Sequence, residues 1–373
     1  MKAWPILGIS IVEATLLLAH WFLFHTWIEF WDAPSAITTL VLRIAMFLLG
    51  FSFIAAALLS FRFANPLVVV LYKFAAVWLG FLNYLFLAAC LSWLIWYALL
   101  LSNLSANPAA ARPFIAAGLA VLAALTGIYG LLNARRIRVR RIAVPLPGLP
   151  QSWRGRRAVL ISDLHLGNIN GAGFARRIVA MVASLQPHVV FIPGDLFDGT
   201  HADLDKLAAP FKDLAPPFGI FFSTGNHEEF AGEEHYLEAA ARSGMSILNN
   251  EKVTLDGLHI VGVPNGDSHN PIRLRATLEG LRLSPAEPSI LLNHIPSRLP
   301  IVERAGVSLQ LSGHTHVGQL FPFTWLTRRV FGKFTYGLQR FGALQVYTSS
   351  GAGTWGPPMR VGTVPEIVLL EFQ

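Results

Sequence analysis

The sequence predicts an N-terminal region of four membrane-spanning helices followed by a C-terminal α/β domain of two packed mixed β-sheets flanked by helices. Hydrophobic residues make up 53% of the 373 residues and charged residues only 14%, too apolar for a wholly water-soluble protein. Few of the charges lie in residues 3–133. From residue 157 onward, short apolar runs end in polar motifs, as in α/β proteins. We therefore predict a transmembrane region (1–133), a basic juxtamembrane segment and proline-rich linker (134–156), and an α/β domain (157–373).

Four apolar segments are long enough to cross a bilayer core, which takes about 20 helical residues. We expect the spans at residues 5–24, 36–60, 73–101 and 114–133. The third apolar run already starts at Pro66, and residues 66–72 could lie along the membrane interface before the span begins. The first segment is not a simple cleaved signal peptide, because further spans follow it.

Positive charges predict which side of the membrane each end occupies. The first loop, residues 25–35, has no Lys or Arg, whereas the second carries Arg62 and the third only Arg112. Five arginines follow the fourth span: Arg135, Arg136, Arg138, Arg140 and Arg141. The positive-inside rule therefore places both termini and the α/β domain in the cytoplasm. The net charge of +7 is explained by this juxtamembrane cluster, and no nucleic-acid partner is expected.

Histidines and an arginine lie in or beside the first two spans. His20 and His25 stand at the end of the first span, so we interpret them as interfacial residues rather than metal ligands. Arg43 lies inside the second span, where a charge is costly. It either faces the helix bundle for a functional reason or extends to the interface. The single cysteine, Cys90, excludes an intrachain disulfide.

Short apolar runs predict the strands of the α/β domain. We expect an amphipathic helix at residues 174–185 and strands at residues 158–161, 189–193, 219–223, 247–248, 253–255, 260–263, 290–292, 309–311, 344–347 and 367–371. Five polar motifs follow such strands: Asp163-Leu-His165, Gly194-Asp195-Leu-Phe-Asp198, Gly225-Asn226-His227-Glu228, Asn293-His294 and Gly313-His314-Thr-His316. Each alone would mean little. Together they predict a ligand site, because α/β sheets bind ligands at the carboxyl ends of their strands.

These residue types suit a pair of divalent metal ions. Such a pair needs hard oxygen ligands, neutral imidazoles and one shared carboxylate, with the ions about 3.5–4 Å apart. We expect Asp195 to be the bridge. Asp163 and His165, two apart on an extended segment, would grip one ion. Asn226 offers an amide oxygen. His294 and one histidine of the His314/His316 pair would complete the ligand shell of one ion, and the other histidine of the pair would complete the shell of the second ion.

With these motifs, residues 157–373 resemble the calcineurin-like metallophosphoesterase superfamily. They are most similar to its bacterial membrane-associated branch, which includes UDP-2,3-diacylglucosamine hydrolases of lipid A biosynthesis. The resemblance implies a metallophosphoesterase domain with two divalent metal ions (manganese, iron or zinc). It implies Asp163, His165, Asp195 and His316 as ligands of one ion, Asp195, Asn226, His294 and His314 as ligands of the other, and His227 as the general acid. Val317, where glycine is usual, and His188, where aspartate is usual, depart from the pattern outside the ligands.

The resemblance implies a metal-dependent hydrolase of phosphoric ester or pyrophosphate bonds in the bacterial inner membrane, with its catalytic domain facing the cytoplasm. Its expected partners are membrane lipids and a lipid-linked phosphate or pyrophosphate substrate such as UDP-2,3-diacylglucosamine. Two alternatives remain: a membrane-tethered phosphodiesterase acting on soluble substrates, and a non-catalytic membrane sensor that uses a phosphoesterase fold. The intact ligand set argues against the sensor.

Other polar residues have two readings each. Asp198 and Glu228 either orient the metal ligands or cap loops. His201, His235, His259 and His269 follow no strand end and are interpreted as surface or satisfied histidines. Residues 320–341 interleave seven aromatic residues with Arg328, Arg329, Lys333 and Arg340. This stretch is either a flap packed on its own domain or an interfacial flap that meets lipid.

Overall fold

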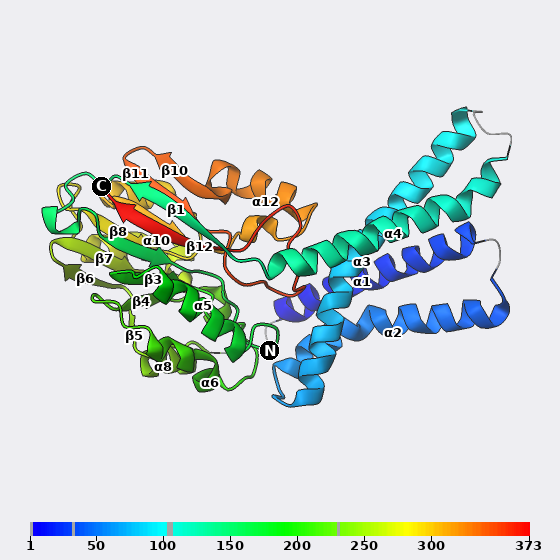
Figure 1. Ribbon diagram of the computed structural model, residues 1–373, viewed down its shortest axis with the longest axis horizontal. Coiled ribbons are helices and arrows are strands. Elements are labelled where there is room, and N and C mark those ends of the chain that lie inside the picture. Colours follow the sequence, from blue (N-terminus) through cyan, green and yellow to red (C-terminus); the bar gives the residue numbers. More distant parts are fainter. Residues whose placement is uncertain (1–2, 32–33, 103–106, 230–231) are drawn as a thin grey trace. The chain divides into compact units, whose positions relative to one another are not determined.

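The computed structural model describes residues 3–31, 34–102, 107–229 and 232–373. The chain divides into two compact units (Figure 1). One consists of Met1–Leu132 together with Gly356–Met359, and the other of Asn133–Trp355 together with Arg360–Gln373. Each unit is described separately below.

The N-terminal unit contains four long helices, as predicted: α1 (Ala3–Phe30), α2 (Ala36–Ser60), α3 (Pro66–Ser102) and α4 (Pro108–Ala134). All four are long and apolar enough to cross a membrane. Many of their outward side chains are large and apolar, such as Leu18, Leu101 and Phe114. Such surfaces are stable in hydrocarbon, where a helix satisfies its own backbone groups.

Helix α3 is continuous from Pro66, so no break separates residues 66–72 from the predicted third span. Pro66 suits the first helical turn because its missing N–H would have no partner there. Asn65 caps the helix through Oδ1, which accepts from the Val68 N–H at 3.0 Å. At 37 residues the helix is about 55 Å long, longer than a hydrocarbon core of about 30 Å.

The interpretation of His20 as an interfacial residue is wrong. His20 is only 3% exposed, and its Nε2 accepts a hydrogen bond of 2.8 Å from Trp78 Nε1 on α3. Helix α1 runs on to Phe30, which places His20 within the helix rather than at its end. His25 stacks on Trp21 at 5.7 Å. Arg43 is exposed, and its guanidinium lies 5.7 Å from the centre of the Phe24 ring.

The C-terminal unit contains two six-stranded mixed sheets, which confirms the predicted fold class. The first has the order β1-β12-β2-β3-β4-β5, with β1 (Arg138–Val144), β2 (Arg157–Leu160), β3 (Val189–Pro193), β4 (Ile220–Ser223), β5 (Met245–Ile247) and β12 (Glu366–Phe372). The second has the order β10-β11-β9-β8-β7-β6, with β6 (Glu251–Leu255), β7 (Leu258–Gly262), β8 (Ser289–Leu292), β9 (Leu309–Ser312), β10 (Gly337–Phe341) and β11 (Leu344–Thr348). In each sheet the central strands are parallel.

Three apolar cores hold the layers together. Side chains such as Leu160, Phe191, Ile290 and Leu311 fill the space between the two sheets. The other face of the first sheet packs against α5 (Ala172–Ser184) and α8 (Glu234–Arg242). The other face of the second sheet packs against α10 (Pro271–Gly280) and α11 (Leu299–Arg304). Because both faces of each sheet are covered, the central strands β3, β4, β8 and β9 are buried along their whole length.

Short helices connect these elements. They are α6 (Leu204–Ala208), α7 (Asn226–Glu229), α9 (Asn265–His269) and α12 (Phe323–Phe331), with 3₁₀ turns η1 (Gln151–Trp153), η2 (Ala209–Asp213), η3 (His316–Gly318) and η4 (Gly332–Thr335). Helix α7 is separated from the end of β4 by two residues, and η3 from the end of β9 by three. Both therefore lie at the carboxyl ends of central strands.

The prediction for residues 134–156, a basic juxtamembrane segment and a proline-rich linker, missed a strand: Arg138–Val144 form the edge strand β1. This strand pairs in parallel with β12 along its whole length, from Arg138 opposite Glu366 to Val144 opposite Phe372. Its arginines are exposed, and Arg141 lies 3.6 Å from Glu371. Charged side chains are a common protection of sheet edges. The pairing partner is more than 220 residues away, so no local pattern reveals the strand.

Candidate metal centre

Every predicted site residue lies just beyond the carboxyl end of a central strand. Asp163 and His165 follow β2, Asp195 follows β3, Asn226 and His227 begin α7 after β4, His294 follows β8, and His314 and His316 follow β9. Asn226 and His314 are half-buried and the others are buried. The two sheets thus bring all five motifs to one place, as predicted from their order.

Five of these residues have a left-handed backbone, which is uncommon for residues other than glycine. The φ angles are 54° for Asp163, 48° for His165, 51° for Asp195, 66° for His314 and 45° for His316. Strand β2 ends at Leu160, so the expectation that Asp163 and His165 lie on an extended segment is wrong. Such conformations cost about 1–3 kcal/mol each and tend to gather at functional sites.

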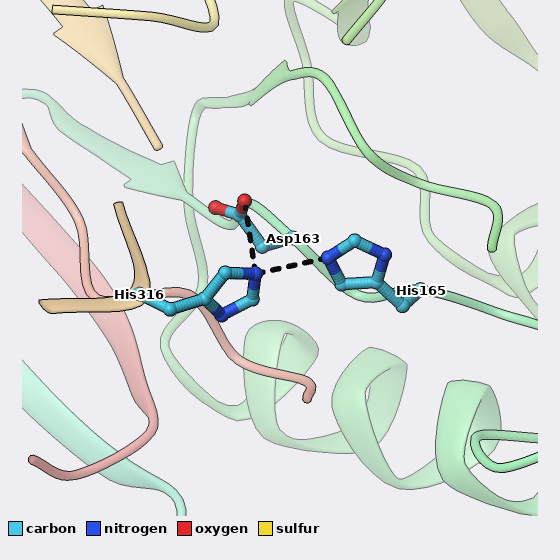
Figure 2. A group of neighbouring side chains, drawn as sticks. All are labelled: Asp163, His165 and His316. Carbon is cyan, nitrogen blue, oxygen red and sulfur yellow. Dashed lines mark hydrogen bonds and ion pairs between the residues drawn. The ribbon is translucent and has the colours of Figure 1, made fainter. Parts of the chain in front are cut away.

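Asp163, His165 and His316 form one group of converging ligand atoms (Figure 2). His316 Nε2 lies 3.5 Å from Asp163 Oδ1 and 3.0 Å from His165 Nε2. Asp163 is fixed on both oxygens: Oδ2 accepts from Ser162 Oγ at 2.5 Å, and Oδ1 accepts from the His314 N–H at 2.9 Å.

Asp195 lies between this group and a second set of ligands. Its Oδ2 is 3.7 Å from His165 Nε2 and 3.2 Å from His294 Nε2. In the second set, Asn226 Oδ1 lies 3.0 Å from His314 Nδ1. Asp163, Asp195 and His294 also form a group whose ligand atoms lie within 4.8 Å of one another. Asp195 therefore lies between His165 of the first group and His294 of the second set, and its role as a bridge stays a prediction.

His227 lies beside both carboxylate and imidazole groups. Its backbone N–H donates to Asp195 Oδ1 at 3.0 Å, and its ring lies 4.5 Å from that of His165. The ring is also close enough to form a third possible ligand group with His165 and Asp195. Its Nδ1 lies 3.0 Å from the backbone oxygen of Asp198. A carbonyl oxygen can only accept, so Nδ1 is the donor in this hydrogen bond.

The donor set fits a divalent metal. In the described part of the chain, the ion-pair partners of Asp163 and Asp195 are histidines, not Lys or Arg. His294 Nδ1 lies 2.8 Å from the Pro193 carbonyl oxygen, to which it must donate, so Nε2 is the nitrogen through which it would bind a metal. Carboxylates, imidazoles and an amide oxygen together suit manganese, iron or zinc.

Burial keeps three of the imidazoles neutral and ready to bind a cation. It lowers the pKa of His314 to about 3 and that of His165 and His316 well below the ordinary value. The Arg360 guanidinium adds to this effect at His316. Burial alone would raise the pKa of Asp195. The neighbouring imidazoles, of which His294 has the largest effect, hold that pKa well below the ordinary value, so Asp195 is ionised.

His294 behaves differently, and this predicts that metal binding releases a proton. Burial lowers its pKa, but the Asp195 carboxylate outweighs burial and raises it to about 10. Without metal, His294 is therefore protonated at pH 7 and must lose a proton to bind through Nε2. We expect metal affinity to rise with pH towards about 10 and about one proton to be released per protein at pH 7. Calorimetric titration in two buffers of different ionisation enthalpy measures this number.

The same raised pKa has a consequence for the metal-free fold. Since it exceeds the ordinary value of 6.5, the ion pair with Asp195 contributes fully to stability below pH 6.5. That contribution is lost as pH rises through about 10.

In the calorimetric experiment His294→Asn should abolish proton release, whereas a change at the exposed His235 should not. Binding at pH 7 without proton release would contradict the assigned charge of His294.

Glu228 holds two of the ligand loops in place. It is fully buried, and its carboxylate accepts from the backbone N–H groups of Gly225 at 2.7 Å, Phe197 at 2.9 Å and Asp195 at 3.1 Å. Burial, and then the negative charge of Asp195, raise the pKa of Glu228 to about 8. Glu228 thus caps these loops through their backbone, and one of the capped residues is the predicted ligand Asp195. Gly225 is needed because a Cβ there would overlap Asp195 Oδ1.

We predict that Glu228→Gln weakens metal binding by about 10–100-fold, the range for residues that orient metal ligands. The amide NH₂ would face backbone donors, and unsatisfied buried groups cost about 1–3 kcal/mol. Metal titration and denaturant unfolding measure the two effects. The control is Glu234→Gln, because Glu234 is exposed on α8. Unchanged affinity in Glu228→Gln would mean that the loops hold their shape without this carboxylate.

Sequence reasoning missed Arg360, which is fully buried beneath the site. Its Nη1 donates to the His316 backbone oxygen at 3.1 Å, and its Nη2 donates to the Gly353 oxygen at 2.5 Å and lies 3.1 Å from His316 Nδ1. A glycine-rich stretch ending in Arg was the only signal.

Val317 has φ 53°, a conformation that favours glycine, which gives the physical reason why glycine is usual there.

The remaining histidines stay outside the site. His201, His235 and His269 are exposed, and His259 Nε2 lies 3.0 Å from Glu287 Oε2. None of the three possible ligand groups among the described residues contains these histidines, His20 or His25. Asp198 contacts the site through its backbone oxygen, and its Oδ1 lies 3.8 Å from His165 Nδ1.

The geometry agrees with comparisons to known proteins. Residues 156–318 match the family described as calcineurin-like phosphoesterase. A Danio rerio protein named "Transmembrane protein with metallophosphoesterase domain" is 35% identical over 66% of this chain and 60% of its own length. A Bos taurus protein of that name is 32% identical over 71% of this chain and 63% of its own length. An uncharacterized metallophosphoesterase of Campylobacter jejuni is 32% identical over 66% of each chain.

The chain thus spans less than two thirds of the length of the fish and cattle relatives. The match to the family covers all five motifs from Asp163 to His316. The strand-end ligands, the two mixed sheets and the matched region agree with one another. The C-terminal unit of this chain therefore belongs to the calcineurin-like metallophosphoesterase superfamily.

Proposed function

We propose that this protein is a membrane-anchored, dinuclear metal-dependent phosphoesterase that hydrolyses a phosphate or pyrophosphate ester of a lipid-linked substrate. The observation that carries this proposal is the position of Asp195. Its carboxylate lies within 3.2–3.7 Å of imidazole nitrogens from two different ligand sets. A carboxylate shared in this way is the feature that separates a dinuclear centre from a single-metal site.

The distances support the ligand sets that the resemblance implies. Asp163, His165, Asp195 and His316 would hold one ion, and Asp195, Asn226, His294 and His314 the other. When bound, such ions polarise the phosphoryl oxygens and supply a nucleophile from water. Ser162, Glu228 and the Pro193 carbonyl orient the ligands. His227, with Nδ1 fixed by the Asp198 carbonyl, would pass a proton from Nε2 to the departing oxygen.

The four candidate spans favour a substrate that is itself in the membrane. Strand β1 begins only four residues after the end of α4, so the catalytic unit is tethered closely to the last span. UDP-2,3-diacylglucosamine, a nucleotide-linked lipid, is the named candidate from the family resemblance. None of the relatives described above is named as a hydrolase of that lipid. We therefore propose the chemical class, an amphipathic phosphate or pyrophosphate, and treat the named lipid as one test substrate.

The test uses the purified full chain in proteoliposomes after treatment with a chelator. Phospholipids, pyrophospholipids, UDP-2,3-diacylglucosamine and a soluble chromogenic phosphodiester are offered with and without added manganese, iron or zinc. We expect metal-dependent hydrolysis, with long-chain substrates preferred over the soluble one. Preference for the soluble ester would favour a tethered phosphodiesterase. Metal binding without hydrolysis of any substrate would favour a sensor.

We also propose a multi-pass arrangement in the bacterial inner membrane with both termini and the catalytic unit in the cytoplasm. Arginines cluster just after α4 and within β1, and the loop between α1 and α2 has neither Lys nor Arg. A reporter that is active only in the cytoplasm should therefore work when fused after Arg141. A reporter that is active only in the periplasm should work when inserted in residues 25–35. A periplasmic signal after Arg141 would exclude a cytoplasmic lipid precursor as the substrate.

A further inference from the structure

The exposed apolar side chains of the catalytic unit gather in one place. Eight large apolar residues of the described part of this unit are exposed. Two of them, Val139 and Ile272, lie apart in β1 and α10. The other six belong to α12 and the segments beside it: Phe321, Phe323, Trp325, Leu326, Val330 and Trp355. We call these six residues the α12 patch. Clustered exposed apolar residues mark interaction surfaces far more often than scattered ones do.

Helix α12 is turned with its apolar face outward. Phe323, Leu326 and Val330 recur at the spacing of one helix face and are 49%, 52% and 67% exposed. The side towards the domain instead carries Thr324, which is 8% exposed, and the half-buried Thr327. A helix that served only to cover its own domain would bury Leu326 and Val330. This arrangement favours the second sequence reading, an interfacial flap, over a flap packed on its own domain.

The helix is held rigidly in this orientation. Gly318 of η3 lies so close to the start of α12 that a Cβ there would overlap the Phe323 backbone. The Phe321 N–H donates to the Val361 oxygen at 3.0 Å, and Thr315 Oγ1 donates to the Thr335 oxygen at 2.8 Å. The outward face is therefore a property of the folded unit and not of a loose segment.

The α12 patch reaches the metal centre directly. The ring of Trp355 lies 5.8 Å from that of His227, and its backbone is joined to Gln319 by two hydrogen bonds of 2.9 Å. Phe331, at the end of α12, lies 6.1 Å from the His314 ring. An apolar molecule lying on the patch would thus have its polar end close to the general-acid and ligand histidines.

The charges around the patch select its partner. Residues 320–341 contain four cations, Arg328, Arg329, Lys333 and Arg340, and no Asp or Glu. Arg328 and Arg329 are exposed on α12 itself. Exposed Trp, Phe and Leu beside arginines and no acids are the composition of helices that lie in the headgroup region of anionic membranes. The chain's own candidate spans keep a bilayer within reach.

We propose that the α12 patch inserts into the surface of an anionic bilayer and is the route by which a lipid-anchored phosphate reaches the metal centre. The insertion stands on the exposed residues and charges alone. The route rests on the proposed function. The aromatic and aliphatic side chains would enter the acyl boundary, while the arginines bind lipid phosphates at the headgroup level.

Insertion is tested on the full chain in proteoliposomes by single-cysteine labelling. Cys90, the only cysteine, is changed to Ser, and Leu326→Cys or Val330→Cys carries an environment-sensitive fluorophore. The matched control is Ile272→Cys, which is also apolar and is 78% exposed in α10 of the same unit. We expect lipids with a quencher on the acyl chain to quench the labels at 326 and 330 several-fold more than the label at 272. Equal quenching at all three sites would overturn the proposal.

Two variations separate a membrane from other partners. Each basic residue near an anionic surface strengthens binding about fivefold, so Arg328→Gln with Arg329→Gln should lower the equilibrium constant for insertion about 25-fold at low salt. High salt should reduce that difference, because the Debye length shortens from about 30 Å at 0.01 M to 3 Å at 1 M. The opposite result would be that the lipids do not quench the labels and that the fluorescence depends on the protein-to-lipid ratio. It would identify a second copy of this chain as the partner and overturn the proposal.

The route is tested separately from insertion. Leu326→Ser with Val330→Ser should reduce hydrolysis of a long-chain phosphodiester in vesicles about tenfold or more, because apolar burial is lost. Hydrolysis of a soluble phosphodiester should stay the same, as should both activities in Ile272→Ser. Equal loss on both substrates would show that α12 is only structural and would overturn the route. If the unchanged protein hydrolyses neither substrate, the proposed function fails, and the quenching result still decides insertion.

Discussion

Asp195→Ala is expected to abolish metal-dependent hydrolysis and to leave at most one metal ion bound per chain. Asp195 is 2% exposed and lies 3.2 Å from His294 Nε2 and 3.7 Å from His165 Nε2. Removing its carboxylate takes a ligand from both proposed sites and leaves the remaining histidines without their negative partner. Metal ions contribute several kcal/mol of transition-state stabilisation, so the loss should be about 10³–10⁴-fold in kcat.

Two measurements check this expectation: metal content by mass spectrometry after dialysis, and turnover of a phosphodiester with saturating metal. Asp195→Asn is a sharper variant, because it keeps the shape and removes the charge. Asp213→Asn is the matched control, since Asp213 is exposed and outside the site. Normal turnover with two metals bound in Asp195→Ala would refute the bridging assignment, and with it the dinuclear centre.

His227→Ala is expected to keep both metals and lose about 10²–10⁴-fold in kcat, the usual contribution of a general acid. Its Nδ1 lies 3.0 Å from the Asp198 carbonyl oxygen, to which it donates, so we assign the proton transfer to Nε2. The ring also lies 4.5 Å from that of His165, so a role as a ligand must be separated from a role as an acid. Loss of a metal ion in His227→Ala would assign it as a ligand.

The leaving group gives a second readout for His227. An alkyl ester leaves as a strongly basic alkoxide and needs a proton, whereas p-nitrophenolate is a weak base and needs little help. His227→Ala should therefore lose far more activity on the alkyl ester than on the p-nitrophenyl ester. Change of the exposed His235 to Ala should affect neither. An equal loss on both esters would mean that His227 positions the substrate and does not donate a proton.

Local patterns in the sequence were sufficient for the predicted spans, most strands and the ligand motifs. A membrane-spanning helix is recognisable from about 20 consecutive apolar residues because its backbone hydrogen bonds are all internal. Buried parallel strands such as β3 and β9 are short apolar runs, and residues just beyond their carboxyl ends meet at one edge of the sheet. Asp163, Asp195 and His294 could therefore be named together before any coordinates.

Features that depend on distant partners were decided only by the tertiary structure. Residues Arg138–Val144 form a strand because they pair with β12, which lies more than 220 residues later in the sequence. His20 became buried because Trp78 of another helix donates to it. Arg360 acquired a role only when the loop after β11 passed beneath His316. Long-range contacts of this kind leave no periodic trace in the sequence.

The geometry of the ligands and the orientation of α12 also depend on contacts between distant segments. The left-handed φ angles of Asp163, His165, Asp195, His314 and His316 cost free energy locally and persist because surrounding contacts hold them. The composition of residues 320–341 showed an amphipathic segment of aromatics and cations, but not which face it would expose. Close packing of Gly318 against Phe323 turned that face outward. The sequence by itself therefore determined which residues are the candidate metal ligands, and the tertiary structure decided how they are held, because that depends on contacts between distant segments.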